Sequence, residues 1–290
     1  IHASGNNVSN LKNILKAVSG GAVELYHNNN RKFFTTSFGT QISCDPDGDG
    51  LKLEGTTNRI DIVANTNRGG ATNTILELDA HWNNTSVAFI ALATGDDTTN
   101  KDDGRIRFFT KPSGGTIDER LRIETDGSVL MGWTSSRDVG FTHKLQLEDT
   151  GNTPRAISII SNRANTHASH IDFAKSRGGS LGSNTIVQDD DFLGHIIFRG
   201  ADGTDLNQVA ARITGAVDGT PAENNIPGRL EFYTATGGTN SERARINANG
   251  SIQITPEGST SNPYMLIDTS GDSVRFSAKF IIRWRQSVSE

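Results

Sequence analysis

Two stretches of the chain repeat one pattern of three short strands. Residues 104–131 read GRIRFFTKPSGGTIDERLRIETDGSVLM, and residues 228–254 read GRLEFYTATGGTNSERARINANGSIQI. The two copies match from the Gly-Arg opening to the Gly-Ser near the end, and the second copy has one residue fewer after the glycine-rich turn. A shorter version lies between them, at residues 194–198 and 211–213. A repeated unit of this kind indicates stacked or elongated modules.

Side chains alternate within each copy. In residues 229–234, Leu230, Phe232 and Thr234 fall on one side of the predicted strand, and the charged residues fall on the other. This period of two predicts half-buried strands. The dipeptides Asp126-Gly127 and Asn249-Gly250 predict two-residue hairpin turns, because both positions of such turns favour positive φ.

The alternation also predicts which face is covered. We expect the apolar side chains to point inward and the arginines to face solvent beside Glu119, in surface ion pairs worth less than ~1 kcal/mol each. The arginines concerned are Arg105, Arg107, Arg120 and Arg122.

Composition favours a chain that is completed by other copies of itself. Only 34% of the 290 residues are hydrophobic and 31 are glycine, which is too polar for one large core and too regular for disorder. A net charge of −5 without a basic stripe argues against nucleic-acid binding. The single cysteine, Cys44, excludes an intrachain disulfide framework. The longest apolar run, residues 87–93, is far short of the ~18–20 residues that span a bilayer, so no membrane insertion is expected.

Residues 9–18 are expected to form a short helix, because Leu11, Ile14, Leu15 and Val18 recur at helical spacing before Gly20-Gly21. It would serve as a coiled-coil collar or pack on a neighbouring sheet. The expected organisation is a short helical collar (1–20), a β-hairpin module (21–71), a first β-repeat module (72–150), a second β-repeat module (151–262) and C-terminal strands (263–290). Further strands are expected at residues 60–64, 157–160 and 170–174. The fold class is all-β and elongated, as a triangular β-helix or as stacked β-sandwich modules.

Three segments resemble bacteriophage tail-fibre proteins, particularly those of marine phages. They are GGAVELYHNNNRKFFTTSFGTQI (residues 20–42), DGSVLMGWTSSRDVGFTHKLQLEDTG (126–151) and PGRLEFYTATGGTNSERARINANGSI (227–252). The resemblance implies a β-rich, elongated homotrimer in the virion that is used for host attachment. It implies as partners other phage tail proteins and a glycan or protein of the host cell surface.

Three further motifs resemble parts of known sites. Residues 45–50 match the first half of a Ca²⁺ loop, but Thr56 stands where the loop needs Glu, which favours a polar turn. His167, His170 and Asp172 have a spacing that places the two rings on opposite sides of a strand, which favours solvent-facing histidines over a metal site. Residues 178–182 match G-x-S-x-G without the strand and helix of a nucleophile elbow.

Runs of aspartate at residues 189–191, 96–97 and 102–103 could supply the paired carboxylates of a glycan hydrolase, but such runs are typical of solvated loops. We therefore expect no catalytic residue, cofactor or metal. His81 and Trp82, in a turn between strands, are the expected receptor contact, because exposed aromatic rings stack on sugars; the alternative is burial of Trp82 at a subunit boundary.

The function expected from these features is that of a non-enzymatic, homotrimeric tail-fibre segment in host attachment. The alternatives are a tailspike that hydrolyses surface polysaccharide and a purely structural capsid or neck fibre.

Overall fold

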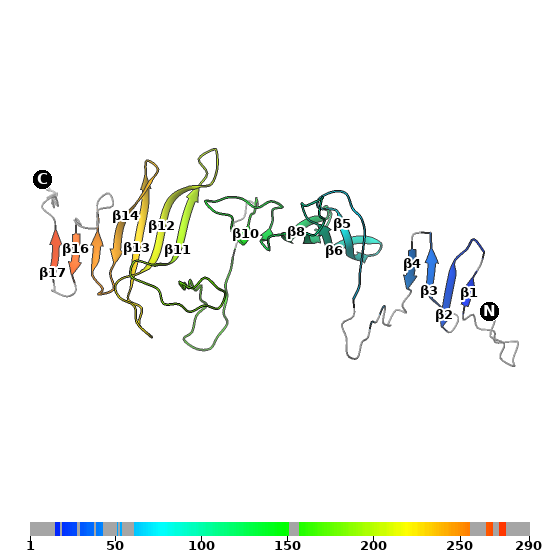
Figure 1. The fold of residues 1–290 in the computed structure, drawn as a ribbon, viewed down its shortest axis with the longest axis horizontal. Helices are drawn as coiled ribbons and strands as arrows, with labels where there is room; N and C mark the ends of the chain where they lie inside the picture. The colour runs from blue at the N-terminus through cyan, green and yellow to red at the C-terminus, as the bar shows by residue number, and fades with distance from the viewer. Residues whose placement is uncertain are drawn as a thin grey trace, which may run out of the picture. The chain divides into compact units, whose positions relative to one another are not determined.

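The computed structural model describes residues 15–17, 19–27, 30–37, 39–42, 51, 53, 61–150, 157–255, 265–268 and 273–276. Its chain divides into two compact units, Ile1–Asn65 and Thr66–Glu290. The described residues form three β-sheets and no helix, which confirms the all-β fold class (Figure 1). Accordingly, the described part of the chain has no helix that is long and apolar enough to cross a membrane.

The first unit holds the N-terminal sheet. Its four strands are β1 (Leu15–Ala17), β2 (Val23–His27), β3 (Asn30–Thr36) and β4 (Gly39–Ile42), which pair antiparallel in chain order.

The expected helix is wrong at its C-terminal end. Residues 15–17 are strand β1, in which Leu15 lies opposite Leu25 and Lys16 forms an ion pair of 3.2 Å with Glu24. The rest of the expected helix, residues 9–14 and residue 18, lies outside the described residues. A helix of ten residues is marginal on its own, whereas the strand gains a backbone ladder and these cross-strand pairs.

The second unit begins with the middle sheet. It consists of β5 (Thr74–Trp82), β6 (Thr85–Thr94), β7 (Gly104–Thr110), β8 (Asp118–Ile123), β9 (Val129–Met131) and β10 (Leu145–Leu147). The first five strands form an antiparallel meander, and β10 joins parallel to β9. The first copy of the sequence repeat is β7 to β9.

The C-terminal sheet is a seven-stranded antiparallel meander (Figure 1). Its strands are β11 (Phe192–Gly200), β12 (Gln208–Val217), β13 (Gly228–Thr236), β14 (Thr239–Ile246), β15 (Ile252–Ile254), β16 (Met265–Asp268) and β17 (Ser273–Phe276). The second copy of the repeat is β13 to β15.

Both predicted turns form, but in a longer version. Gly127 and Gly250 have φ of 78° and 82°, whereas the residues before them do not have positive φ. The amide of Gly127 donates to the carbonyl of Glu124, and that of Gly250 donates to Asn247. The amides of Glu124 and Asn247 also donate to the carbonyls of Ser128 and Ser251, so each hairpin has a three-residue loop that ends in a left-handed glycine instead of the two-residue loop that the dipeptides predicted.

One face of each large sheet carries two apolar rows, formed by residues that lie opposite one another from strand to strand. In the middle sheet they are Leu76, Leu92, Ile106, Ile123, Val129 and Leu145, and Leu78, Ile90, Phe108, Leu121, Met131 and Leu147. In the C-terminal sheet they are Ile196, Ile213, Phe232, Ala244, Ile254 and Met265, and Gly215, Leu230, Ile246, Ile252, Ile267 and Val274. Many of these side chains are uncovered, with exposed fractions of 38–57%.

The opposite faces are charged and buried, so the predicted orientation of the arginines is partly wrong. Arg105 and Arg122 are 6% and 5% exposed, Arg107 is half-buried, and the Arg120 side chain alone is 46% exposed as expected. Among the described residues, ten polar or charged residues are buried and only seven hydrophobic ones. A single copy of the chain thus has a polar interior and open apolar faces.

Small residues explain how the long charged side chains become buried. Arg105 and Arg107 lie opposite Ala93 and Ala91, and Arg229 and Glu231 lie opposite Ala216 and Thr214. The long side chains lie across these small neighbours, which are at most 3% exposed. The methylene groups of arginine bury well against such a surface while the guanidinium keeps polar partners.

Three other predicted strands do not form within the chain. Residues 61–64, 157–160 and 170–174 have no regular secondary structure, and residue 60 lies outside the described part.

Candidate functional site

Glu231 is the centre of the charged face of the C-terminal sheet. It is 1% exposed, and its carboxylate accepts hydrogen bonds from Arg229 Nε at 2.6 Å and from Tyr233 Oη at 2.7 Å. Arg245 lies 3.5 Å away and forms a bidentate pair with Glu242, at 2.6 Å for both contacts. We call the group of Arg229, Glu231, Tyr233, Glu242 and Arg245 the C-terminal clamp.

Loops beside the sheet extend this clamp. Arg229 reaches Asp190 at 2.9 Å and Asp218 at 3.6 Å, and donates to the carbonyl of Val217 at 2.6 Å. One guanidinium group therefore connects the start of strand β13 with the loops beside it.

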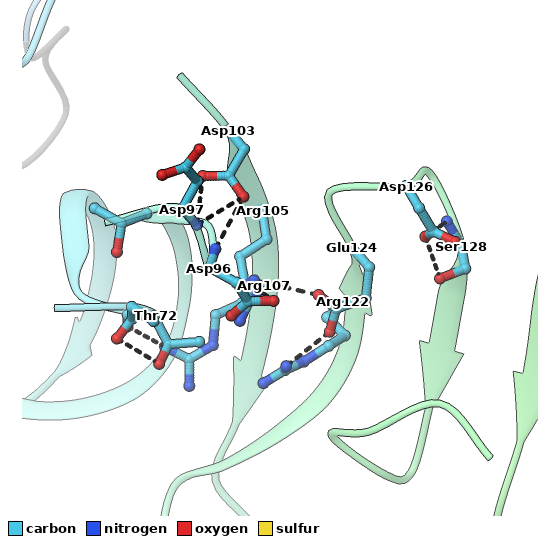
Figure 2. Close-up of polar contacts among 12 residues, drawn as sticks. Thr72, Asp96, Asp97, Asp103, Arg105, Arg107, Arg122, Glu124, Asp126 and Ser128 are labelled. Atoms are coloured by element: carbon cyan, nitrogen blue, oxygen red, sulfur yellow. Dashed lines mark hydrogen bonds and ion pairs between the residues drawn. The ribbon is translucent and has the colours of Figure 1, made fainter. Parts of the chain in front are cut away.

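The middle sheet has an equivalent group around Glu119, the middle clamp, which is shown in part in Figure 2. Glu119 pairs with Arg107 at 2.6 Å and with both Nε and Nη2 of Arg122, the latter at 2.9 Å. Arg122 continues to Glu124 at 2.8 Å, and Arg105 pairs with Asp96 at 2.8 Å (Figure 2). Glu119 and Arg122 match Glu242 and Arg245 in the repeat, but Arg107 stands where the second copy has Glu231. Both clamps therefore keep the pair of a glutamate with the arginine three residues later, and the charge at the facing position is reversed.

The N-terminal sheet contains a third clamp. Glu24 is buried, accepts from Tyr26 Oη at 2.8 Å and from Arg31 at 2.8 Å, and lies 3.2 Å from Lys16. The tripeptide Glu24-Leu25-Tyr26 has the same pattern as Glu231-Phe232-Tyr233, so a carboxylate held by the tyrosine two residues later occurs in both.

These carboxylates are held in the ionised form. Burial acts to raise the pKa of Glu231, but the hydrogen bonds from Arg229 and Tyr233 outweigh it and lower the pKa below its usual range. Glu119 shows the same balance between burial and its two arginines, with a lowered pKa. Burial, helped by Glu231, raises the pKa of Tyr233 to about 12, and Arg31 followed by Tyr26 lowers the pKa of Glu24 to about 2. Groups held in one charge state suit a structural role rather than proton transfer near neutral pH.

The aspartate runs hold loops together. Asp191 is 2.7 Å from Arg177 and 2.8 Å from Lys175, and these contacts lower its pKa far below the usual range. Asp103 accepts the backbone amides of residues 96 and 97 (Figure 2), and Asp97 accepts those of residues 99 and 100. Both carboxylate oxygens of Asp97, Asp103 and Asp191 therefore accept hydrogen bonds from nearby groups of their own loops.

A polar pocket adjoins each of the two larger clamps. One, of about 560 Å³, is lined by residues that include Arg105, Arg122, Asp126 and Ser128; the other, of about 640 Å³, includes Arg229, Arg245, Asn249 and Ser251. Asp126 accepts both the amide and the hydroxyl of Ser128, at 2.8 and 2.6 Å (Figure 2), and Asn249 does the same for Ser251. The pockets are therefore a repeated feature of the fold.

His81 and Trp82 end strand β5, at the tip of its hairpin with β6. Asn83 and Asn84 make the turn with φ of 48° and 60°. His81 Nε2 lies 2.6 Å from Asp79, which also accepts a hydrogen bond from Ser86. Trp82 is 80% exposed, so the hairpin presents its indole ring to solvent.

The remaining motifs do not come together as sites. The described residues contain no group of three or more His, Cys, Asp or Glu that could hold a metal ion, and His167 and His170 lie in irregular chain. Residues 178–182 form a loop in which the amide of Ser183 donates to the carbonyl of Ser180. Residues 45–50 lie outside the described part of the chain.

The sequence interpretation missed the clamps, although it contained a signal for them. The small residues opposite the charged ones alternate with larger apolar residues in residues 90–93 (Ile-Ala-Leu-Ala), and Thr214 follows Ile213 in the same way. This alternation places the small residues on the charged face, where a long side chain has room to lie down.

The three sheets, with their clamped charged faces and the apolar faces of the two larger sheets, form a fold that is similar to that of a phage fibre domain. The chain is similar to the solved structure of the carboxy-terminal domain of the bacteriophage T5 L-shaped tail fibre, with a TM-score of 0.59 and 17% identity over 83% of this chain and 99% of that one. It is also similar to the structure of that domain with its intramolecular chaperone domain, with a TM-score of 0.59 and 16% identity over 83% of this chain and 68% of that one. No family model and no curated protein matches the chain. At these identities the similarity establishes a shared tail-fibre fold, which agrees with the resemblance in the sequence.

Proposed function

We propose that this chain is a non-enzymatic segment of a virion tail fibre that acts as a homotrimer in host attachment. The observation that carries the proposal is the combination of a tail-fibre fold with apolar rows that one copy leaves open. Other phage tail proteins are its neighbours in the virion under this proposal.

The open apolar rows support assembly. Each row crosses at least six strands of its sheet, and ten of the side chains in the four rows are 38–57% exposed. A contiguous exposed apolar surface of this kind favours burial against another protein surface, and identical copies supply a matching one. Three copies around an axis would cover the rows and protect the sheet edges from uncontrolled pairing.

The hairpin tip at Trp82 is the proposed receptor contact, with a glycan or protein of the host surface as the ligand. The indole is exposed, and the Asp79 contacts of His81 and Ser86 make the hairpin rigid. An aromatic ring held in this way stacks on sugar rings or packs on protein at a low cost in side-chain entropy. Three identical tips per fibre raise weak binding through avidity.

The assembly is tested by the mass in solution. One chain has a mass of 31.2 kDa, so light scattering should give about 94 kDa for three copies (3 × 31.2 kDa). A mass of one chain would contradict the proposal.

Attachment is tested with Trp82→Ala, and Trp133→Ala serves as the matched control because Trp133 is also exposed, at 52%. Binding of labelled trimer to host cells should fall for Trp82→Ala alone, with both variants still trimeric. Loss of binding only in the control would move the contact away from the hairpin. New reducing ends after incubation with host envelope glycans would favour the hydrolase alternative, and binding to the capsid or neck in labelled virions would favour the structural one.

A further inference from the structure

Asn249 and Gly250 form the one Asn-Gly dipeptide of the sequence, in the turn between β14 and β15. In a flexible chain this dipeptide deamidates readily, because glycine has no side chain to hinder an attack by its own backbone nitrogen. The nitrogen loses its proton and bonds to Cγ of the asparagine, ammonia leaves, and a cyclic succinimide remains. Water then opens the ring to aspartate or to isoaspartate. The turn therefore contains the dipeptide most prone to this spontaneous modification.

The folded turn holds both reacting groups in other hydrogen bonds. The amide of Gly250 donates to the carbonyl of Asn247 at 2.9 Å, so the attacking nitrogen is occupied. Oδ1 of Asn249 accepts the backbone amide of Ser251 at 3.0 Å and the Ser251 hydroxyl at 2.7 Å. Ser251 itself is only 4% exposed, so the carboxamide is held by a buried residue. Nucleophile and electrophile are therefore both engaged elsewhere in the fold.

The first copy of the repeat has an aspartate in the same geometry. Asp126 accepts the amide and the hydroxyl of Ser128 at 2.8 and 2.6 Å (Figure 2). Lys144 lies 3.3 Å from the Asp126 carboxylate and balances its charge. An acid therefore fits this turn where a cation lies beside it.

The second copy has no such cation at the turn. The pocket beside Asn249 is lined by Asp189, Asp190 and Asp218 and, among the described residues, by no lysine. Its two arginines already pair with the glutamates of the C-terminal clamp and with aspartates of the loops. Like charges that share a site repel one another, so a carboxylate at position 249 would weaken this turn.

We propose that Asn249 is a site of deamidation that the folded turn suppresses, and that Ser251 contributes to the suppression by holding the carboxamide. The ring closes only when the turn opens. Aspartate at this position carries a charge that the C-terminal sheet does not balance, and isoaspartate also adds a backbone carbon to the hairpin loop. Each reaction therefore leaves a permanent change that weakens the sheet.

Peptide mass mapping of the full chain measures the reaction. In mildly alkaline buffer, Asn249 should convert at least about 10-fold more slowly in the folded protein than in the chain unfolded in urea, because the hydrogen bonds of the turn must break first. Equal rates in the two samples would rule out the suppression. An Asn249 that stays unmodified in urea would rule out the site itself.

The role of Ser251 is tested by removing its hydroxyl. Ser251→Ala should raise the rate of conversion about fivefold, as expected for the loss of one net hydrogen bond. The matched control Ser128→Ala removes the same bond from the first copy, whose turn has no asparagine, and should leave the rate at Asn249 unchanged. If Ser251→Ala reacts no faster than the unmodified protein, or if both variants accelerate equally, the assignment to Ser251 is overturned.

The cost of the product is tested with Asn249→Asp. The added charge should lower Tm by about 2–4 °C in a domain of this size. An unchanged Tm would show that the second copy accommodates the charge as the first copy does, and would overturn the claim that the modification weakens the sheet.

Discussion

Replacement of Glu231 by Gln tests the buried charge at the centre of the C-terminal clamp. The amide keeps the shape of the side chain but no longer neutralises Arg229, which lies 2.6 Å away and has a side chain only 8% exposed. Removal of one partner of a buried ion pair costs about 3–5 kcal/mol. Arg229 retains Asp190 and Asp218, so we expect the lower end, about 3 kcal/mol in the free energy of unfolding.

The assay is thermal unfolding followed by circular dichroism, at one protein concentration and one scan rate. A loss of this size should lower Tm by roughly 6–12 °C, from about 2–4 °C for each kcal/mol in domains of this size. The control is Asp118→Asn, the same chemical change in an ion pair of 3.2 Å whose two side chains are about half exposed. It should cost less than about 1 kcal/mol. Equal, small effects of the two variants would refute the reasoning that the charged face is buried and energetically coupled.

Three further outcomes follow from the structure. Ile254→Glu places a charge on an open apolar row and should reduce the mass in solution from that of a trimer to that of a single chain. The control Leu181→Glu, at a fully exposed loop residue, should leave the mass unchanged. A trimeric Ile254→Glu protein would contradict the proposal that the apolar rows are covered by other copies. The pKa values of Glu119 and Glu231 are lowered in the fold, so the stabilisation from their ionised forms is fully present above about pH 4.3 and is lost as the pH falls through the folded pKa values. Tm should therefore drop on acidification, and it should drop less steeply in Glu231→Gln. A parallel drop in the unmodified protein and in Glu231→Gln would count against the clamp. In Gly132→Ala, a φ of 84° is combined with a Cβ atom that would lie 2.0 Å from the Glu148 carbonyl oxygen. This variant should therefore destabilise the fold by more than the ~1–2 kcal/mol expected for Gly127→Ala, where φ is 78° and no atom lies within 4 Å of the added Cβ. Denaturant unfolding compares the two variants, and an equal cost would show that the contact with Glu148 is relieved.

The sequence predicted the strands of the repeat well because period-two alternation and glycine turns are local signals. Residues 104–131 and 228–254 became the expected strands, whereas residues 15–17 were assigned to a helix, because Leu15 fits both periods and only its pairing with Leu25 decides between them. Alternation shows that the two faces of a sheet differ in polarity, but it does not show which face is buried by the rest of the chain. Arg105 and Arg122 were therefore placed in solvent, although small cross-strand neighbours allow them to be buried.

The same limit applies to the candidate site. The turn that presents Trp82 could be located from the sequence, whereas the 80% exposure of the Trp82 side chain is a property of the folded chain that the local pattern does not show. The pattern of residues 157–160 and 170–174 predicts strands, but in the described part of the chain they have no regular secondary structure.

Each clamp draws its ion pairs from one sheet and the loops that border it. Loss, duplication or replacement of one whole sheet would therefore leave no charged side chain without its partner in the sheets that remain. Recombination between related genes can then lengthen such a chain, shorten it or exchange its hairpin tips in single steps, and every intermediate would inherit intact electrostatics.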